Sequence, residues 1–246
     1  MPLSIGIKRH SLQLDQWRSL ARQCLDFLLP QHCSLCRVPC TDLLCEHCQD
    51  QLPFLNHCCR VCALPLGAPG ICAECLQSPP EFKRALCALR YETLAAQLIL
   101  QFKDRQQLQF GTFMTQLLAH TLAQQDAPQV DAITAVPQHW RRSLQRGFNP
   151  AHYIAQQLSS HFKLPYSPLF VRAQHSPAQK SLDRKTRLKN LKGVFQLRKD
   201  KVPQRVAIVD DVITTGATVR TLAQALRAAG VEEVQVWALA RTAKHR

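Results

Sequence analysis

Apolar residues along the chain fall into short runs and into helical spacings, separated by polar turns. The short runs suit strands and cover residues 85–91, 131–136, 206–209 and 233–240, with a less regular run at 167–172. Helical spacing marks residues 12–29, 94–102, 110–122, 151–162 and 219–229. The run at 206–209 lacks polar alternation, so it suits a strand buried on both faces of a parallel sheet. We therefore expect an α/β fold, with a parallel sheet flanked by helices.

The predicted strand at 206–209 runs into a turn whose residues suit a phosphate group. Two carboxylates, Asp210 and Asp211, follow the strand and could accept hydrogen bonds from sugar hydroxyls. Backbone N–H groups and hydroxyls at a helix N-terminus bind anions, and glycine lets the backbone approach them closely. The alternative is an ordinary strand-to-helix turn with Asp and Thr as capping residues. The small residues of the turn are Thr214, Thr215, Gly216, Ala217 and Thr218.

Four Cys-x-x-Cys pairs precede this domain, and each offers two thiolates at a spacing that suits one tetrahedral zinc. Eight thiolates predict two structural Zn²⁺ ions, with sequential pairing preferred over interleaved pairing. Redox dithiols and an iron–sulfur cluster are the alternatives. The pairs are Cys33 with Cys36, Cys45 with Cys48, Cys59 with Cys62, and Cys72 with Cys75. Further possible ligands are Cys40, Cys58, His32, His47 and His57, whereas Cys24 and Cys87 lie in apolar patterns and are expected in the core.

The net charge of +14 is unevenly distributed. Residues 141–205 hold fifteen Lys and Arg residues and two Asp residues, a net charge of about +13. Such a field favours polyanions, including phosphorylated small molecules and nucleic acids, although a merely soluble basic surface is the alternative. The polar stretch at 173–192 lacks periodicity and suits either a mobile lid over a phosphate site or a disordered segment.

A basic loop is expected beside the phosphate turn, because ligands of open parallel sheets bind beyond the carboxyl ends of strands. The strand at 131–136 ends there, and the loop at 138–149 carries Arg141, Arg142 and Arg146. Guanidinium groups suit phosphate oxygens, and a solvated basic loop is the alternative. Lys103 is expected to be a solvated charge at a helix C-terminus rather than a phosphate ligand.

The length of 246 residues allows one medium domain and a small one. We expect a helix at 1–29, a double zinc finger at 30–80 and the α/β domain at 81–246. No run of eighteen apolar residues and no secretory signal are visible in the sequence, so a cytoplasmic location is expected.

The block from 206 to 218 resembles the phosphoribosyl-pyrophosphate (PRPP) loop of type I phosphoribosyltransferases, a hydrophobic strand followed by two acids and Thr-Thr-Gly-x-Thr. Its context resembles the ComF family, phosphoribosyltransferase-like proteins linked to DNA uptake in naturally competent bacteria. The motifs, in order, are the cysteine pairs, RRSLQRGFN at 141–149, QKSL at 179–182, Arg-x-x-Asn at 187–190 and VDDVITTGAT at 209–218. The resemblance covers nearly the whole chain from Cys33 onward, with Pro150 standing where the family usually has Gln.

This resemblance implies a type I phosphoribosyltransferase-like fold that binds PRPP with Mg²⁺. Residues 214–218 would hold the 5-phosphate, Asp210 and Asp211 would hold the ribose and act in catalysis, and the arginine loop would contact pyrophosphate. It also implies a factor of natural transformation that handles incoming single-stranded DNA in the cytoplasm, peripheral to the inner membrane, with a DNA helicase and the DNA-uptake channel as neighbours. Trp140, Phe148 or Tyr153 could stack on bases if exposed; burial is the alternative for each and is the expectation for Tyr153, which lies on a predicted helix. The alternative is an active phosphoribosyltransferase with an unidentified nitrogen acceptor, and the sequence leaves open whether the chain is an enzyme.

Overall fold

The computed structural model of the chain describes residues 32–138, 140–172, 195–198 and 202–243, and of residues 140, 141 and 143 it describes the backbone alone. The expected helix at 12–29 and the polar stretch at 173–192 lie outside the described residues. The chain divides into two compact units, residues 1–51 and residues 52–246. The expected zinc-finger segment at 30–80 therefore contributes residues to both units.

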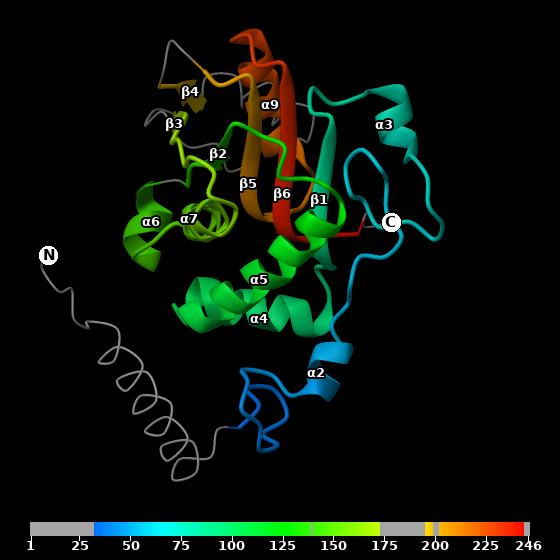
Figure 1. Cartoon of the computed structure of the whole chain (residues 1–246), viewed down its shortest axis with the longest axis vertical. Helices are drawn as coiled ribbons and strands as arrows, with labels where there is room; N and C mark the ends of the chain where they lie inside the picture. The colour runs from blue at the N-terminus through cyan, green and yellow to red at the C-terminus, as the bar shows by residue number, and fades with distance from the viewer. Residues whose placement is uncertain (1–31, 139, 173–194, 199–201, 244–246) are drawn as a thin grey trace, which may run out of the picture. The chain divides into compact units, whose positions relative to one another are not determined.

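A four-stranded parallel sheet forms the centre of the second unit, which confirms the expected fold class. Its strand order is β1 (Arg84–Arg90), β6 (Glu233–Arg241), β5 (Arg205–Ile213) and β2 (Ala132–Ala135), as Figure 1 shows. Strand β5 is longer than the apolar run predicted, because it pairs with β6 beyond that run, with Asp210 opposite Ala238. The expectation that the two carboxylates follow the strand was wrong, since both lie within its last four residues.

Three helices cover one face of this sheet. They are α4 (Thr93–Asp104), α5 (Leu108–Gln124) and α7 (Pro150–Phe162), close to their expected positions. On this side the fully buried Trp237 of β6 meets the ring of Phe162, with centroids 6.4 Å apart. The apolar stripes of these helices are therefore core, as the helical spacing indicated.

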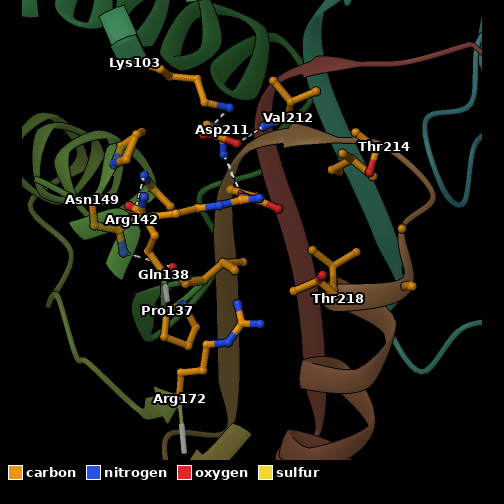
Figure 2. A pocket seen from close by; sticks show the side chains of 18 of the residues that line it. Lys103, Pro137, Gln138, Arg142, Asn149, Arg172, Asp211, Val212, Thr214 and Thr218 are labelled. Atoms are coloured by element: carbon orange, nitrogen blue, oxygen red, sulfur yellow. Dashed lines mark hydrogen bonds and ion pairs between the residues drawn. The ribbon is translucent and has the colours of Figure 1, made fainter. Parts of the chain in front are cut away.

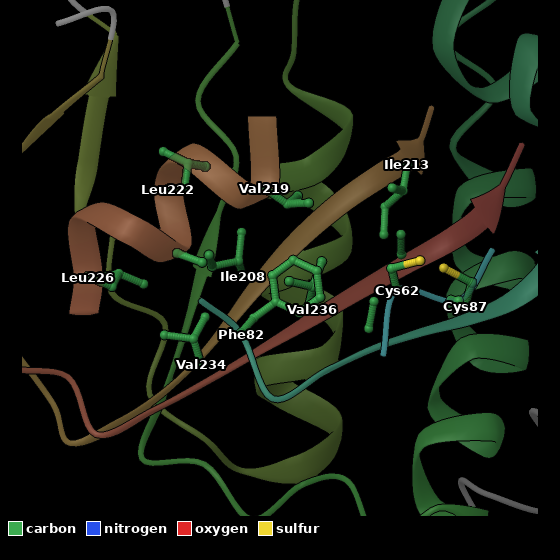
Figure 3. Close-up of a cluster of buried hydrophobic side chains, with 14 of the residues drawn as sticks. Cys62, Phe82, Cys87, Ile208, Ile213, Val219, Leu222, Leu226, Val234 and Val236 are labelled. Carbon is green, nitrogen blue, oxygen red and sulfur yellow. The ribbon is translucent and has the colours of Figure 1, made fainter. Parts of the chain in front are cut away.

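The opposite face is covered by helix α9 (Ala217–Ala228) together with a cysteine-containing segment. Successive residues of a strand point to opposite faces, so Val206 and Ile208 of β5 share this side. They pack in one cluster with Leu222 of α9 and with Cys62 and Phe82, as Figure 3 shows for several of these side chains. The second half of the cysteine segment is therefore part of the core of the α/β unit.

The remaining elements are short. Strands β3 (Phe170–Arg172) and β4 (Phe195–Leu197) form a separate antiparallel pair, so the strand expected at 167–172 is shorter and lies outside the main sheet. The loop expected at 138–149 contains helix α6 (Trp140–Arg146), a run without Gly or Pro. Helices α2 (Glu46–Asp50) and α3 (Ala73–Gln77) begin directly after Cys45 and Cys72. Among the described residues, no helix combines the length and apolar character needed to cross a membrane.

Candidate functional site

Residues 214–216 of the turn that the sequence predicts to suit a phosphate lie between β5 and α9, and Ala217 and Thr218 are the first residues of α9. Gly216 caps the helix with φ of +77°, a left-handed conformation that favours glycine. The Thr215 hydroxyl accepts a hydrogen bond from the Ala217 N–H at 3.3 Å. The turn therefore presents the first N–H groups of a twelve-residue helix, at the end where its dipole attracts anions.

A cavity of about 280 Å³ opens beside this turn, at the carboxyl ends of β5 and β2. Figure 2 shows side chains from several elements converging on it. All seven residues that the sequence singled out on β5 and its turn line the cavity: Asp210, Asp211, Thr214, Thr215, Gly216, Ala217 and Thr218. Arg142 and Arg146 also line it, whereas the side chain of Arg141 lies outside the described part of the structure.

Lys103 was expected to be solvated, and this expectation was wrong. Its ammonium lies 2.7 Å from the Asp211 carboxylate across the cavity wall, and only 18% of the Lys103 side chain and 16% of the Asp211 side chain are exposed. Helix α4 ends at the carboxyl edge of the sheet, which brings a distant lysine to the acid pair. The sequence pattern around Lys103 could not predict this contact, because Asp211 is more than a hundred residues away in the chain.

Asp210 is held in an environment that opposes its ionisation. Burial of the carboxyl, together with the negative charge of Asp211, raises the pKa of Asp210 to about 8. The Asp211 N–H donates to the Asp210 carboxyl at 2.9 Å, and the positive charge of Lys103 opposes the shift. Perturbed carboxyl groups in a cavity are candidates for ligand binding or chemistry.

The basic side of the cavity has two different kinds of arginine. Arg146 donates to Asp104 at 2.9 Å, so its charge is partly neutralised. Arg172 of β3, which the sequence analysis did not single out, lines the cavity with Arg142 and lies 5.6 Å over the ring of Phe195. Partial burial and the positive charge of Arg142 lower the pKa of Arg172. Two guanidinium groups that repel each other this way favour an anion between them.

Gln138 is a second cavity residue that the sequence pattern did not identify. It lines the cavity, and both polar atoms of its buried side-chain amide lack a hydrogen-bond partner among the described residues. Buried polar groups are almost always paired, so an unsatisfied amide beside a cavity indicates a polar ligand or water there. Its position just after β2, at the carboxyl edge of the sheet, is the sequence signal that could have identified it.

The motif at 141–149 has a structural part as well. The Asn149 side chain accepts from the Ala151 N–H at 3.0 Å and donates to the Val136 carbonyl at 3.1 Å, which fixes the start of α7 to the end of β2. Phe148 and Tyr153 pack against Phe102, with ring centroids 5.3 and 5.4 Å from it. These two rings are engaged in packing, and the side chain of Trp140 lies outside the described part.

The eight cysteines form two groups of four, with the sequential pairing that was preferred. One group is Cys33, Cys36, Cys45 and Cys48, and the other is Cys59, Cys62, Cys72 and Cys75. In each group the four sulfur atoms lie within 4.8 Å of one another. The distances from Cys36 to Cys45 Sγ (3.5 Å) and from Cys62 to Cys72 Sγ (3.6 Å) are close to the ~3.8 Å edge of a zinc–thiolate tetrahedron.

The chemistry of the second group also suits a metal. Burial opposes ionisation of Cys59, but N–H groups including that of Cys72 lower its pKa to about 7. Burial raises the pKa of Cys62 to about 11, so a metal ion would be needed to ionise all four thiols near neutral pH. Each group can hold a zinc ion through its four thiolates. Cys87 is buried in the core, as expected, and Cys24 lies outside the described residues.

Comparisons with known proteins identify relatives over most of the chain. The model of the phosphoribosyl transferase domain matches residues 144–246. The chain is 36% identical to competence protein F of Haemophilus influenzae over 211 residues, which cover 80% of this chain and 90% of that protein. It is 32% identical to DNA utilization protein YhgH of Salmonella typhi over 223 residues, 87% of this chain and 98% of that protein. Among solved structures, the allosteric regulatory enzyme of purine biosynthesis is 23% identical with a TM-score of 0.38, over 52% of this chain and 26% of that one.

Proposed function

This chain belongs to the family of competence protein F and DNA utilization protein YhgH, and we propose on that basis that it acts in the uptake and use of DNA, with a phosphoribosyltransferase-like domain that binds PRPP. The observation that supports PRPP binding is the cavity at the end of β5. It combines a phosphate turn, two carboxylates and a basic wall within about 280 Å³.

Each part of PRPP has a chemical counterpart around the cavity. The N–H groups and hydroxyls of residues 214–218 suit the 5-phosphate, because they stand at the positive end of the α9 dipole. Asp210 and Asp211 suit the ribose hydroxyls as acceptors, and Arg142 and Arg146 suit the pyrophosphate. The unpaired amide of Gln138 would gain a partner. Mg²⁺ bound to PRPP would neutralise part of the pyrophosphate charge.

Lys103 would change partners when the ligand binds. Without ligand its ammonium neutralises Asp211 at 2.7 Å. Ribose hydroxyls that donate to Asp211 would compete with this contact, and the ammonium is then free to approach an anionic group of the ligand. Lys103 therefore belongs to the proposed PRPP site, although the sequence pattern gave it no role.

We place the DNA function in the cytoplasm, at the inner face of the membrane, with single-stranded DNA as the polyanion. The supporting observation is the net charge of about +13 carried by residues 141–205. Phosphate contacts would dominate such binding, because the aromatic rings of Phe148 and Tyr153 are engaged in packing. A DNA helicase and the DNA-uptake channel are the proposed protein neighbours.

A second candidate function is phosphoribosyl transfer to a nitrogen acceptor. It is favoured by the presence of both acids in the cavity, since carboxylates beside the ribose would stabilise the positive charge that develops as pyrophosphate leaves. The reaction would break the bond between the anomeric carbon and pyrophosphate and form a bond from that carbon to the acceptor nitrogen, whose proton is lost. The assay is pyrophosphate release with nucleobases or DNA present.

Titration calorimetry with PRPP–Mg²⁺ tests the proposed ligand. We expect saturable binding to the wild-type protein and its loss in the Asp210→Ala, Asp211→Ala double variant, with Asp131→Ala as the matched control. Asp131 is paired with Arg205 at 2.7 Å and does not line the cavity, so its variant should bind as wild type does. Unchanged affinity in the double variant would show that the acids do not hold the ribose.

Anisotropy of a labelled single strand tests the DNA function separately. Affinity should fall with salt, with a log–log slope of about −0.7 for each phosphate neutralised. The double acid variant should bind the strand as well as wild type or better, because it has lost two negative charges. Absence of binding at about 50 mM salt, where phosphate contacts are strongest, would contradict this part of the proposal.

A further inference from the structure

The second cysteine group is joined to the phosphate turn by a buried arginine. Arg241 is the last residue of β6, and only 5% of it is exposed. Its guanidinium donates to the Cys62 carbonyl at 3.1 Å and to the Ile213 carbonyl at 3.0 Å, and also to the carbonyl of Thr214. One side chain therefore fixes both a cysteine knuckle and the first residue of the phosphate turn.

A second arginine makes a parallel connection from the helix that follows the turn. Arg220 lies in the first turn of α9, where its N–H donates to the Gly216 carbonyl at 3.0 Å. Its guanidinium donates to the Ser78 carbonyl at 3.0 Å and lies 3.8 Å from the Cys75 sulfur. The same guanidinium is 3.6 Å from the Glu74 carboxylate.

Packing connects the same two regions. Cys62 and Phe82 belong to one buried cluster with Ile213 and Val219, which flank the turn, and Figure 3 shows these side chains together. The Ala85 N–H also donates to the Val61 carbonyl at 2.7 Å, which ties the knuckle to strand β1. Movement of the cysteine segment would therefore be transmitted to residues that flank the phosphate turn.

A metal ion bound by the second cysteine group would also strengthen this connection through its charge. Four thiolates around Zn²⁺ carry a net charge of −2, and cations beside such a centre are stabilised by it. The Arg220 guanidinium lies 3.8 Å from the Cys75 sulfur, so it faces this charge directly. Without the metal, the four sulfur atoms would no longer be held together, and with them the Cys62 carbonyl and the Cys75 sulfur that the two arginines contact.

We propose that the metal in the second cysteine group supports the phosphate turn, with Arg241 and Arg220 as positioning residues, so that loss of this metal weakens binding of a sugar phosphate that no cysteine touches. The inference rests on the proposed function for the identity of the ligand. The first cysteine group belongs to a separate compact unit, and its metal should have no such effect. Because coupling is reciprocal, a bound sugar phosphate should also slow release of the second metal.

Matched cysteine variants separate the two groups. Cys59→Ser with Cys62→Ser should lose one zinc per chain and weaken PRPP–Mg²⁺ binding by at least about fivefold, the lower end of usual coupling. Cys33→Ser with Cys36→Ser should also lose one zinc but bind PRPP–Mg²⁺ within about twofold of wild type. Equal affinities in the two variants would overturn the inference.

Arg241→Met leaves all eight cysteines in place and therefore separates the connection from the metal itself. It should retain two zinc ions and still weaken PRPP–Mg²⁺ binding, whereas Arg241→Lys should restore part of the affinity. If the second-group variant does not fold, zinc release from the wild-type protein to a chelator replaces it. PRPP–Mg²⁺ should slow release of one of the two ions, and equal release of both ions with and without bound ligand would overturn the inference.

Hydrogen exchange tests the connection without relying on the ligand. Amide exchange in residues 213–220 should rise when the second metal is absent and stay unchanged when the first is absent. Unchanged exchange in both variants would overturn the inference. If exchange rises in the second-group variant but the wild-type protein binds no PRPP, the connection is supported and the proposed ligand is wrong.

Discussion

Binding of PRPP–Mg²⁺ near neutral pH should release a proton from Asp210. The structure raises the pKa of this carboxyl to about 8, through burial and through the negative charge of Asp211. At pH 7 the group is therefore mostly protonated. Ribose hydroxyls that donate to the carboxylate, and the charge of Mg²⁺, both favour the ionised form. Ionisation on binding therefore releases most of one proton per site at pH 7, and less as the pH rises above about 8.

Titration calorimetry in two buffers with different ionisation enthalpies measures this proton count. Asp210→Asn should abolish the release, whereas Asp131→Asn should leave it unchanged because the pairing of Asp131 with Arg205 lowers the pKa of Asp131. Binding at pH 7 with no released proton would show that Asp210 does not ionise when the ligand binds, and equal release from Asp210→Asn would show that the proton comes from another group.

The raised pKa of Asp210 also determines how the stability of the folded protein changes with pH. Because the folded-state pKa of Asp210 is raised, the folded state binds more protons than the unfolded state between about pH 4 and pH 8. The stability contributed by this group is fully present below its unfolded pKa and is lost as the pH rises through about 8. Asp210→Asn should therefore show a smaller loss of stability than wild type over this interval.

Three further predictions concern the fold and the metal sites. Gly111→Ala should lower the free energy of unfolding by about 1–3 kcal/mol in urea, because a Cβ there would lie 2.4 Å from the Phe102 ring, and Gly67→Ala, with open space around it, should change little. Gly216→Ala and Gly230→Ala both place alanine at a positive φ (+77° and +91°) and should each cost about 1–2 kcal/mol, but only the first should weaken PRPP–Mg²⁺ binding. Equal affinity in both would place the phosphate elsewhere. Freshly purified protein should contain two zinc ions per chain by elemental analysis, and one or none would contradict the two-group assignment.

The position of the turn after β5 could be predicted because its residues are local in the sequence. The strand, the acids and the small residues from Thr214 to Thr218 are contiguous, so their spacing alone indicated their common site. The cysteine pairing was also predictable, since neighbouring knuckles need little chain to meet. The positions of the main strands and helices followed from apolar periodicity to within a few residues.

Features that depend on long-range contacts could not be predicted in this way. The Lys103 contact with Asp211 and the Arg241 contact with Cys62 join residues more than a hundred positions apart. In the sequence alone, Lys103 and Arg241 cannot be told apart from lysines and arginines that are exposed to solvent. The place of Cys62 in the core of the α/β unit could not be predicted from the sequence either, because a zinc module can fold without packing against a sheet.

A crystal structure of the protein with PRPP–Mg²⁺ tests the proposed site most directly. We predict the 5-phosphate on the N–H groups of residues 214–218, ribose hydroxyls on Asp210 and Asp211, and Lys103 displaced from Asp211. A ligand bound outside this cavity, with the 2.7 Å contact between Lys103 and Asp211 intact, would contradict this prediction.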